Sequence, residues 1–250
     1  MLLQEPPRSE GDLNFSLFGV PVRVHPMFWL LALILGLGYR EPMALLTWVV
    51  AAFLSILVHE MGHAAVTRLF GFYPYVVLYG MGGLTLRGPG VLGARNPGPA
   101  GEIAVSAAGS GAQFVLAAAV YYLLKLTRYE VVVVTGFPYV ALPVLIDPNV
   151  PAGFLVFINQ LFFVSVFWGL LNLLPIYPLD GGQISREFLQ RVMPREGLRL
   201  SLMISAFTAT FFTVYVVVEW QGRGIWMAIF FGYLGFASLQ ALTMFRRGPW

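Results

Sequence analysis

The amino-acid sequence predicts an all-α polytopic membrane protein with about six transmembrane helices and a small membrane-associated β element. Composition is the first reason: 58% of the 250 residues are hydrophobic, 11% are charged, and the mean hydropathy is +0.76. A soluble domain carries about 25% charged residues, so this chain has too little polar surface to coat a water-soluble globule. The second reason is a series of long apolar runs between polar segments. Lipid must therefore cover much of the chain.

The composition also excludes several classes of function. The chain contains no cysteine, which excludes disulfides, thiolate zinc ligands and a cysteine nucleophile. The net charge of +3 is weak and the arginines are spread among loops, so no nucleic-acid binding is expected. Residues 1–12 mix both charge signs and do not resemble a signal peptide. We expect a polar N-terminal tail there and a single transmembrane domain over residues 13–250.

The first elements after the tail are a short strand and two apolar helices. Alternating valines within residues 13–25 favour a strand. Met27–Tyr39 follows Pro26, which suits a helix start, but this run is barely long enough to cross a bilayer. Met43–Phe70 predicts one helix that Gly71 ends. At 1.5 Å per residue that helix is roughly 40 Å long, ample for a hydrocarbon core of about 30 Å.

The rest of the chain adds a second β-like piece and four more spans. Residues 74–99 are rich in Gly and Pro, with a β-like piece at Val76–Leu86. The remaining spans are expected at Ala100–Leu126, Gly153–Pro175, Leu198–Trp220 and Ile225–Phe245.

One apolar segment is ambiguous. Val131–Ile146 is interrupted by Gly136, Pro138 and Pro143. Its length is nearer to a re-entrant or interfacial segment than to a span. We therefore do not count it as a seventh span.

The basic residues favour six spans in the cell membrane with both termini in the cytoplasm. In that topology eleven basic residues lie on the inner side: Arg8, Arg23, Arg68, Arg87, Arg95, Arg186, Arg191, Arg195, Arg199, Arg246 and Arg247. Four lie on the outer side: Arg40, Lys125, Arg128 and Arg223. This asymmetry fits the positive-inside rule. A seventh span at Val131–Ile146 would reverse everything after it and remove the asymmetry.

The second expected span contains the strongest chemical signal, H-E-M-G-H at residues 59–63. His59 and His63 are four residues apart, so both imidazoles project from one helical face. That spacing can hold one zinc ion, with Glu60 beside it to act as a base on a water at the metal. Ionisable groups in an apolar helix are costly to bury and are functional by default. The alternative is a hydrogen-bonded polar cluster between helices.

Two histidines leave a catalytic zinc ion short of a protein ligand, because such sites usually have three. Asp180 is the best candidate, since it follows the fourth span and the glycines after it permit a tight turn toward the site. The alternative is an N-cap for a helix over Ile184–Val192. The third histidine, His25, is interpreted as an interfacial or structural residue. In the six-span topology the second and fourth spans run in the same direction, which brings Asp180 to the same side as His59 and His63.

These motifs together resemble the site-2 protease family of intramembrane metalloproteases. The resemblance rests on H-E-x-x-H in a membrane helix, a Gly-rich strand after it, and N-x-x-P-x-x-P-L-D-G-G at a later helix end. It extends from FGVPVRVHPMF near the start to the LDGG turn. It implies one zinc ion held by His59, His63 and Asp180, with Glu60 as the catalytic carboxylate. It also implies that Asn172 faces the site and contacts substrate or the oxyanion, unless that side chain only bonds a neighbouring helix.

The sequence departs from the family pattern in the third span. A G-P-x-x-N element is usual there, but this chain has Ser110 in place of proline and Gln113 in place of asparagine. We expect this difference to affect local helix packing rather than the metal site. The inserted PDZ domain and the C-terminal nucleotide-sensing module of some relatives are not expected here.

The expected reaction is hydrolysis of peptide bonds in or near the transmembrane segments of membrane proteins, as in regulated intramembrane proteolysis. A helical substrate must unwind, and something must then bond its backbone, because lipid offers no partners. Val76–Leu86 can do this by pairing edge-on with an extended peptide, and Gly80, Gly82 and Gly83 would allow close approach. The alternative for this segment is a flexible loop lying on the membrane.

Two other classes of function compete with a peptidase. One is a catalytically inactive membrane scaffold or binding protein of the same fold, which the complete set of Glu60, two histidines and Asp180 disfavours. The other is a metal transporter, which should carry polar residues along several spans. Such residues are sparse beyond Asn159, Gln160, Asn172 and Gln113.

Overall fold

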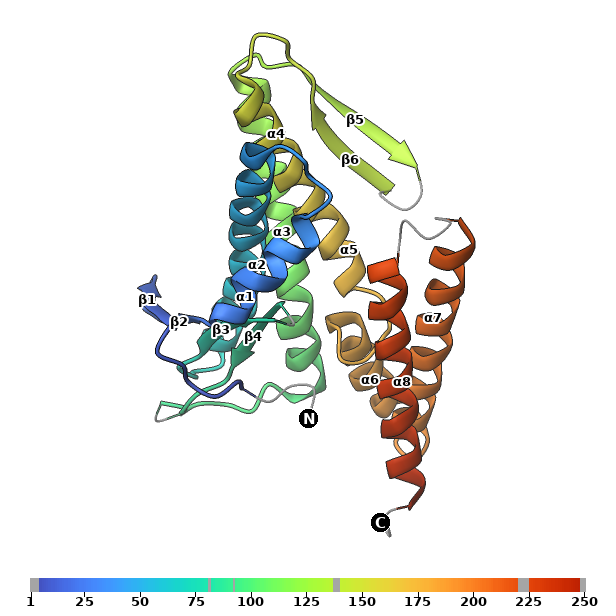
Figure 1. Cartoon of the computed structure of the whole chain (residues 1–250). Coiled ribbons are helices and arrows are strands. Elements are labelled where there is room, and N and C mark those ends of the chain that lie inside the picture. The colour runs from blue at the N-terminus through green and yellow to red at the C-terminus, as the bar shows by residue number, and fades with distance from the viewer. Residues whose placement is uncertain (1–4, 81, 92, 137–139, 220–224, 248–250) are drawn as a thin grey trace. The chain divides into compact units, whose positions relative to one another are not determined.

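The computed structural model describes residues 5–80, 82–91, 93–136, 140–219 and 225–247, most of them helical (Figure 1). Five helices in this part of the chain are long and apolar enough to cross a membrane. They are α2 (Pro42–Leu69), α3 (Gly98–Leu126), the continuous run of α4 (Ala152–Phe163), η1 (Val164–Trp168) and α5 (Gly169–Asn172), α7 (Gly197–Glu219) and α8 (Ile225–Arg247). The prediction of a polytopic helical membrane protein is therefore confirmed.

The chain divides into two compact units, and each is described by itself. Of the described residues, the first unit contains those within 5–96 and 108–171, and the second contains those within 97–107 and 172–247. Pro138 and Arg223, which entered the sequence-based topology, lie outside the described residues, as do residues 1–4 of the expected tail.

The first expected span, Met27–Tyr39, is a short helix in the structure. Helix α1 (Pro26–Gly36) has 11 residues and is about 16 Å long, roughly half the thickness of a hydrocarbon core. Gly36 packs closely on α2, because a Cβ there would overlap the Trp48 side chain. Five full-length helices and this short one make up the expected set of about six.

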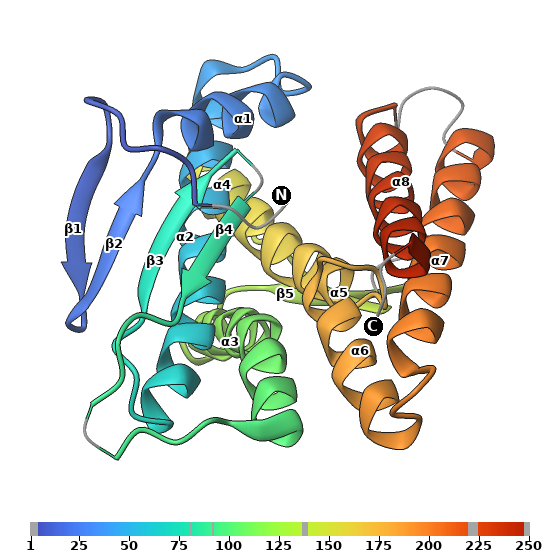
Figure 2. The same ribbon diagram turned by 90° about the horizontal axis from the view of Figure 1, so that it is seen from below.

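Two hairpins in the first unit combine into one four-stranded sheet. The strands are β1 (Leu13–Leu17), β2 (Val20–Val24), β3 (Tyr75–Tyr79) and β4 (Gly82–Leu86). Figure 2 shows them in the order β1–β2–β3–β4, with α2 behind the sheet. The central pair, β2 and β3, is parallel, and both hairpins are antiparallel. The β element is thus confirmed, and Val76–Leu86 is not a flexible loop.

The sequence predicts one strand within residues 13–25, but the structure has two. Phe18 and Gly19 both have positive φ, of 47° and 71°, as the two-residue turns that match strand twist require. The alternating valines of β2 are buried and pack with Leu57 and Ala64 of α2. Burial of this apolar face explains why the strands stay beside a membrane helix.

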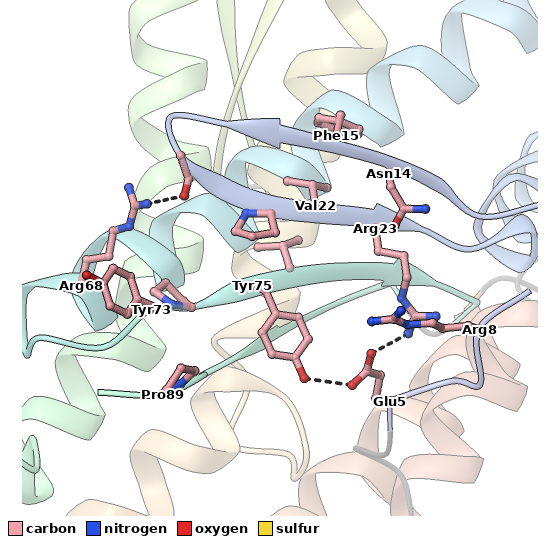
Figure 3. A pocket seen from close by; sticks show the side chains of 14 residues that line it. Glu5, Arg8, Asn14, Phe15, Val22, Arg23, Arg68, Tyr73, Tyr75 and Pro89 are labelled. Carbon is pink, nitrogen blue, oxygen red and sulfur yellow. Dashed lines mark hydrogen bonds and ion pairs between the residues drawn. The ribbon is translucent and has the colours of Figure 1, made fainter. Parts of the chain in front are cut away.

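The opposite face of the sheet is covered by the N-terminal segment through what we call the Arg23 cluster, formed by Arg23, Glu5, Asp12 and Tyr75. The Arg23 guanidinium donates to a Glu5 oxygen at 2.9 Å and to an Asp12 oxygen at 3.0 Å. It also donates to two backbone carbonyls of the segment, those of Pro6 and Pro7. Tyr75 donates to the other Glu5 oxygen at 2.9 Å (Figure 3). Residues 5–12 are therefore attached to the sheet.

The ambiguous segment Val131–Ile146 forms a hairpin of β5 (Val131–Gly136) and β6 (Val140–Leu145). The Asn159 side chain of α4 holds β6, since it accepts from the Leu145 N–H at 2.7 Å and donates to the Leu145 carbonyl at 3.0 Å. An open two-stranded hairpin cannot cross a bilayer, because its edges would leave backbone groups unbonded in lipid. The segment is therefore not a seventh span.

Helix α2 is the central helix of the first unit. It packs against α1, β3, β4, α4 and η1. Gly62 permits the close approach of α3, because a Cβ there would overlap the carbonyl of Ala108. Small residues at such crossings let membrane helices approach closely.

The second unit is built on α6 (Asp180–Val192), α7 and α8. Helices α7 and α8 form an antiparallel pair (Figure 1), and α6 packs on α7. The Ser205 hydroxyl lies 2.8 Å from that of Ser238 on α8 and accepts from the Tyr177 N–H at 2.6 Å. These bonds fix the loop before α6 to the helical pair.

Candidate metal centre

Helix α2 places His59, Glu60 and His63 on one buried turn. Their exposed fractions are 5%, 4% and 8%. The two imidazole Nε2 atoms lie 3.0 Å apart, as the four-residue spacing predicts. Two zinc–nitrogen bonds at a tetrahedral angle would hold such atoms about 3.3 Å apart. The imidazole pair therefore fits a single divalent ion.

The outer nitrogen of His59 is held by a residue from α3. Its Nδ1 lies 3.0 Å from Oε1 of Gln113, which is fully buried. An amide oxygen only accepts hydrogen bonds, so this contact favours the tautomer that carries its proton on Nδ1 and leaves the Nε2 lone pair for a metal. The departure from the family pattern at Gln113 predicts an effect on helix packing rather than on the metal site. That expectation is wrong, because Gln113 contacts a metal-ligand candidate directly.

Helix α3 also makes room for the imidazoles. A Cβ at Gly109 would overlap the His63 ring and lie 2.7 Å from Cε1 of His59. Sequence reasoning missed this residue. Two signals pointed to it: Gly109 stands at the glycine of the G-P-x-x-N element, and it lies in a run of small residues from Ala107 to Ala112, which is common wherever membrane helices pack closely.

Strand β4 lies directly against Glu60. The Thr85 hydroxyl is 2.7 Å from Oε2 of Glu60 and 3.0 Å from the Glu60 carbonyl oxygen, and its single proton bonds one of them at a time. A Cβ at Gly83 would overlap the Glu60 carboxylate. The carboxylate is thus enclosed by the sheet as well as by its own helix.

The three glycines expected to aid substrate binding have different environments. Gly83 touches Glu60, as described above. Gly82 has a φ of +110°, a conformation that favours glycine. Gly80 has space for a Cβ, in ordinary contact with Met27. Among the described strands, β4 pairs only with β3, so no described strand pairs with its outer edge.

Asp180 and Asn172 belong to the second unit. Asp180 is buried and is the first residue of α6, whose N-cap is Leu179. The alternative role of Asp180 as an N-cap is therefore wrong. Gly182 lets the preceding loop pack on the start of α6, because a Cβ there would overlap the backbone of Ile176. Asn172 ends α5 and is half-buried.

The candidate ligands are chemically suited to zinc. His59, His63 and Asp180 are all buried, and each offers one ligand atom. Imidazole nitrogen and carboxylate oxygen are both common ligands of catalytic zinc. His25 has a structural role instead, since it is the N-cap of α1 and its Nδ1 accepts from the Met27 N–H at 3.2 Å.

Comparisons with known proteins agree with this description. The family model of peptidase family M50 matches residues 47–212, about two thirds of the chain. Among solved structures, the chain is similar to the site-2 protease from Methanocaldococcus jannaschii, with a TM-score of 0.56 and 20% sequence identity. That match covers 92% of this chain and 95% of the other, and at this identity it shows a shared fold. No curated protein matches the chain.

Proposed function

The chain belongs to peptidase family M50, the family of site-2 proteases, and on this premise we propose that it is an intramembrane zinc endopeptidase. Its family and the five long apolar helices among its described residues make it a multi-pass membrane protein of a metalloprotease family. The observation that carries the proposal is the buried turn of His59, Glu60 and His63, with strand β4 in contact with Glu60. Its substrates are membrane proteins cut in or near their transmembrane segments.

We assign the metal to His59, His63 and Asp180 and the proton transfers to Glu60. A bound zinc ion supplies Lewis-acid chemistry, which lowers the pKa of a coordinated water to about 7 and polarises a peptide carbonyl. Glu60 takes the proton of the attacking water and later delivers it to the leaving amine. Thr85 orients the Glu60 carboxylate through its hydroxyl, which lies 2.7 Å from Oε2. Asn172 is proposed to donate a hydrogen bond from its amide NH2 group to the substrate carbonyl.

The outer edge of β4, with which no described strand pairs, is proposed to bind the substrate backbone. An unwound transmembrane peptide needs hydrogen-bond partners, and an unpaired strand edge offers a complete row of them. Gly80, Gly82 and Gly83 lie at the start of this edge or in the turn before it, so a substrate backbone can approach closely. Pairing there would extend the peptide beside Glu60.

We further propose that both termini and the catalytic residues face the cytoplasm. The parallel pairing of β2 with β3 holds the strands before α1 beside the strands after α2, so the two segments lie on one side of the membrane. Both segments carry arginines, among them Arg23, Arg68 and Arg87. Such residues are enriched on the cytoplasmic side.

The decisive experiment compares the native chain with Glu60→Gln. We expect the variant to fold and to retain zinc but to leave uncut the membrane proteins that the native chain cleaves, because an amide cannot take the proton. Fragments are compared between cells that express each form, and zinc is measured in the purified proteins.

The other outcomes would contradict the proposal. Equal cleavage by pure Glu60→Gln would remove Glu60 as the base. A zinc-loaded native chain that cleaves no membrane protein would be a scaffold. Zinc flux into vesicles without cleavage would identify a transporter.

A further inference from the structure

A line of buried polar side chains connects the candidate metal ligand His59 to the middle of the fourth span. It consists of His59, Gln113, Ser55 and Ser165, which we call the Gln113 network. The Gln113 amide nitrogen donates to the Ser55 hydroxyl at 2.9 Å, and the hydroxyls of Ser55 and Ser165 lie 3.1 Å apart. Gln113, Ser55 and Ser165 are all fully buried. Buried polar groups without water have their geometry set by one another.

The network determines which way the Gln113 amide points. Its nitrogen also lies 3.4 Å from the Ser55 carbonyl, and a carbonyl only accepts hydrogen bonds. The NH2 group must therefore face Ser55, which leaves Oε1 to face His59 Nδ1. If the amide were turned the other way, its NH2 group would face the protonated Nδ1 of His59, and two donors would meet. Its oxygen would then face the Ser55 carbonyl oxygen, and two acceptors would meet. Ser55 thus fixes Oε1 of Gln113 as the hydrogen-bond acceptor that faces His59.

The far end of the network sits on an irregular turn of the fourth span. Val164–Trp168 is a π-helix within an otherwise α-helical run, and Ser165 lies in it. A π-turn inserts one residue and so rotates the side chains that follow it; such turns are frequent at functional sites. Here the turn coincides with the position where Ser165 meets Ser55 of α2.

We propose that Gln113 is a positioning residue for His59: it fixes the imidazole tautomer and ring orientation that present Nε2 to the metal, and Ser55 and Ser165 hold its amide in place. Partners of this kind keep a ligating histidine oriented and raise its basicity, and their loss costs about 10- to 100-fold in metal affinity or activity. Gln113 stands where the related motif has asparagine. The extra methylene sets how far its amide reaches from α3. This inference rests on the proposed zinc site.

The test uses the full-length protein in detergent micelles, labelled with 15N in its histidines. The chain has only three histidines, so the imidazole signals are few. In the zinc-loaded native protein we expect His59 to be protonated at Nδ1 and to bind through Nε2. Zinc affinity is then measured by competition with a chelator for the native chain, Gln113→Leu and Gln160→Leu.

Gln160→Leu is the matched control. Gln160 is also a buried glutamine of a membrane helix in the first unit, and it donates to the Ala44 carbonyl at 2.9 Å. We expect Gln113→Leu to lower zinc affinity about 10- to 100-fold and to disturb the His59 signals. Gln160→Leu should change neither. A general loss of helix packing would affect both variants alike.

Three results would overturn the inference: metal binding through His59 Nδ1 in the native protein, unchanged zinc affinity in Gln113→Leu, or an equal loss in Gln160→Leu. The tautomer measurement needs no variant. If Gln113→Leu does not fold, Ser55→Ala replaces it, with a smaller expected loss of zinc affinity because Oε1 remains. A native chain that binds no zinc would refute the proposed function as well. A native chain that binds zinc and cleaves, with an unaffected Gln113→Leu, would refute the inference alone.

Discussion

The Gln113 network and the Arg23 cluster are both sets of polar side chains in the first unit, but they differ in charge and in access to water. Gln113, Ser55 and Ser165 are neutral and fully buried. In the Arg23 cluster three of the four groups are charged, and the Glu5 side chain is 36% exposed. Within membrane helices no water replaces a lost partner, whereas water can reach part of the Arg23 cluster. The Gln113 network should therefore control the geometry of the candidate metal site, whereas the Arg23 cluster should control only how firmly residues 5–12 are held.

The largest expected effect comes from filling the space beside the imidazoles. In Gly109→Ala the new methyl overlaps the His63 ring and crowds His59, so both candidate ligands must move. A misplacement of about 1 Å can cost about 100-fold in rate. We expect at least that loss of cleavage, together with weaker zinc binding in a chelator competition.

Gly111→Ala is the control for this substitution. It lies two residues away in α3, where a Cβ meets nothing within 4 Å. Alanine also favours the helix over glycine. Loss of zinc in both variants would show that any substitution in this part of α3 disturbs the site. The specific role of Gly109 in leaving space for the two imidazoles would then be wrong.

A substitution with a smaller expected effect on cleavage should distinguish the role of Glu60 as the base from the role of the histidines as metal ligands. Gly83→Ala places a methyl where the Glu60 carboxylate lies, while the imidazoles are untouched. We expect cleavage to fall about 10- to 100-fold with zinc content unchanged. Cleavage rate and metal content are measured on the same preparation. A loss of zinc in this variant would contradict the assignment of separate roles to Glu60 and the histidines.

The smallest effect on activity is expected at the Arg23 cluster. Arg23→Met removes four hydrogen bonds to residues 5–12. Limited proteolysis should then cut this segment about fivefold faster, since its local opening becomes easier. Cleavage of membrane substrates should stay within about twofold, because the cluster covers the face of the sheet opposite α2. Arg8→Met is the control, because it removes an arginine from residues 5–12 themselves and leaves the four hydrogen bonds of Arg23 in place.

The same segment should respond to acid. Burial raises the pKa of Asp12, but hydrogen bonds from Ser9 and the Arg23 guanidinium outweigh it and hold that pKa below its usual range. A lowered pKa in the folded state adds stability at pH values above the unfolded value of about 4, and this stability is lost as the pH falls through the folded value. Protease sensitivity of residues 5–12 should therefore rise below about pH 4 in the native chain. A pH-independent rate would contradict the role of Asp12.

The sequence predicted the long spans and the paired imidazoles because both depend on local periodicity. A run of apolar residues implies a span whatever its neighbours are, and residues four apart share a helical face. Periodicity does not decide the structure of Val131–Ile146, although its run of four valines at 131–134 favours a strand. Helix α1 proved shorter than its apolar run, with glycines at 36 and 38 near its end.

The sequence by itself determined that this chain lies in a membrane, and that His59, Glu60 and His63 share one turn of a membrane helix. Only the tertiary structure decided what surrounds that turn. Gln113 is 54 residues from His59 in sequence, and Gly109 and Gly83 reach the site from α3 and β4. Such contacts depend on how helices and strands pack, and no local pattern encodes that packing. The chemistry of the site could therefore be predicted from sequence, whereas its supporting residues could not.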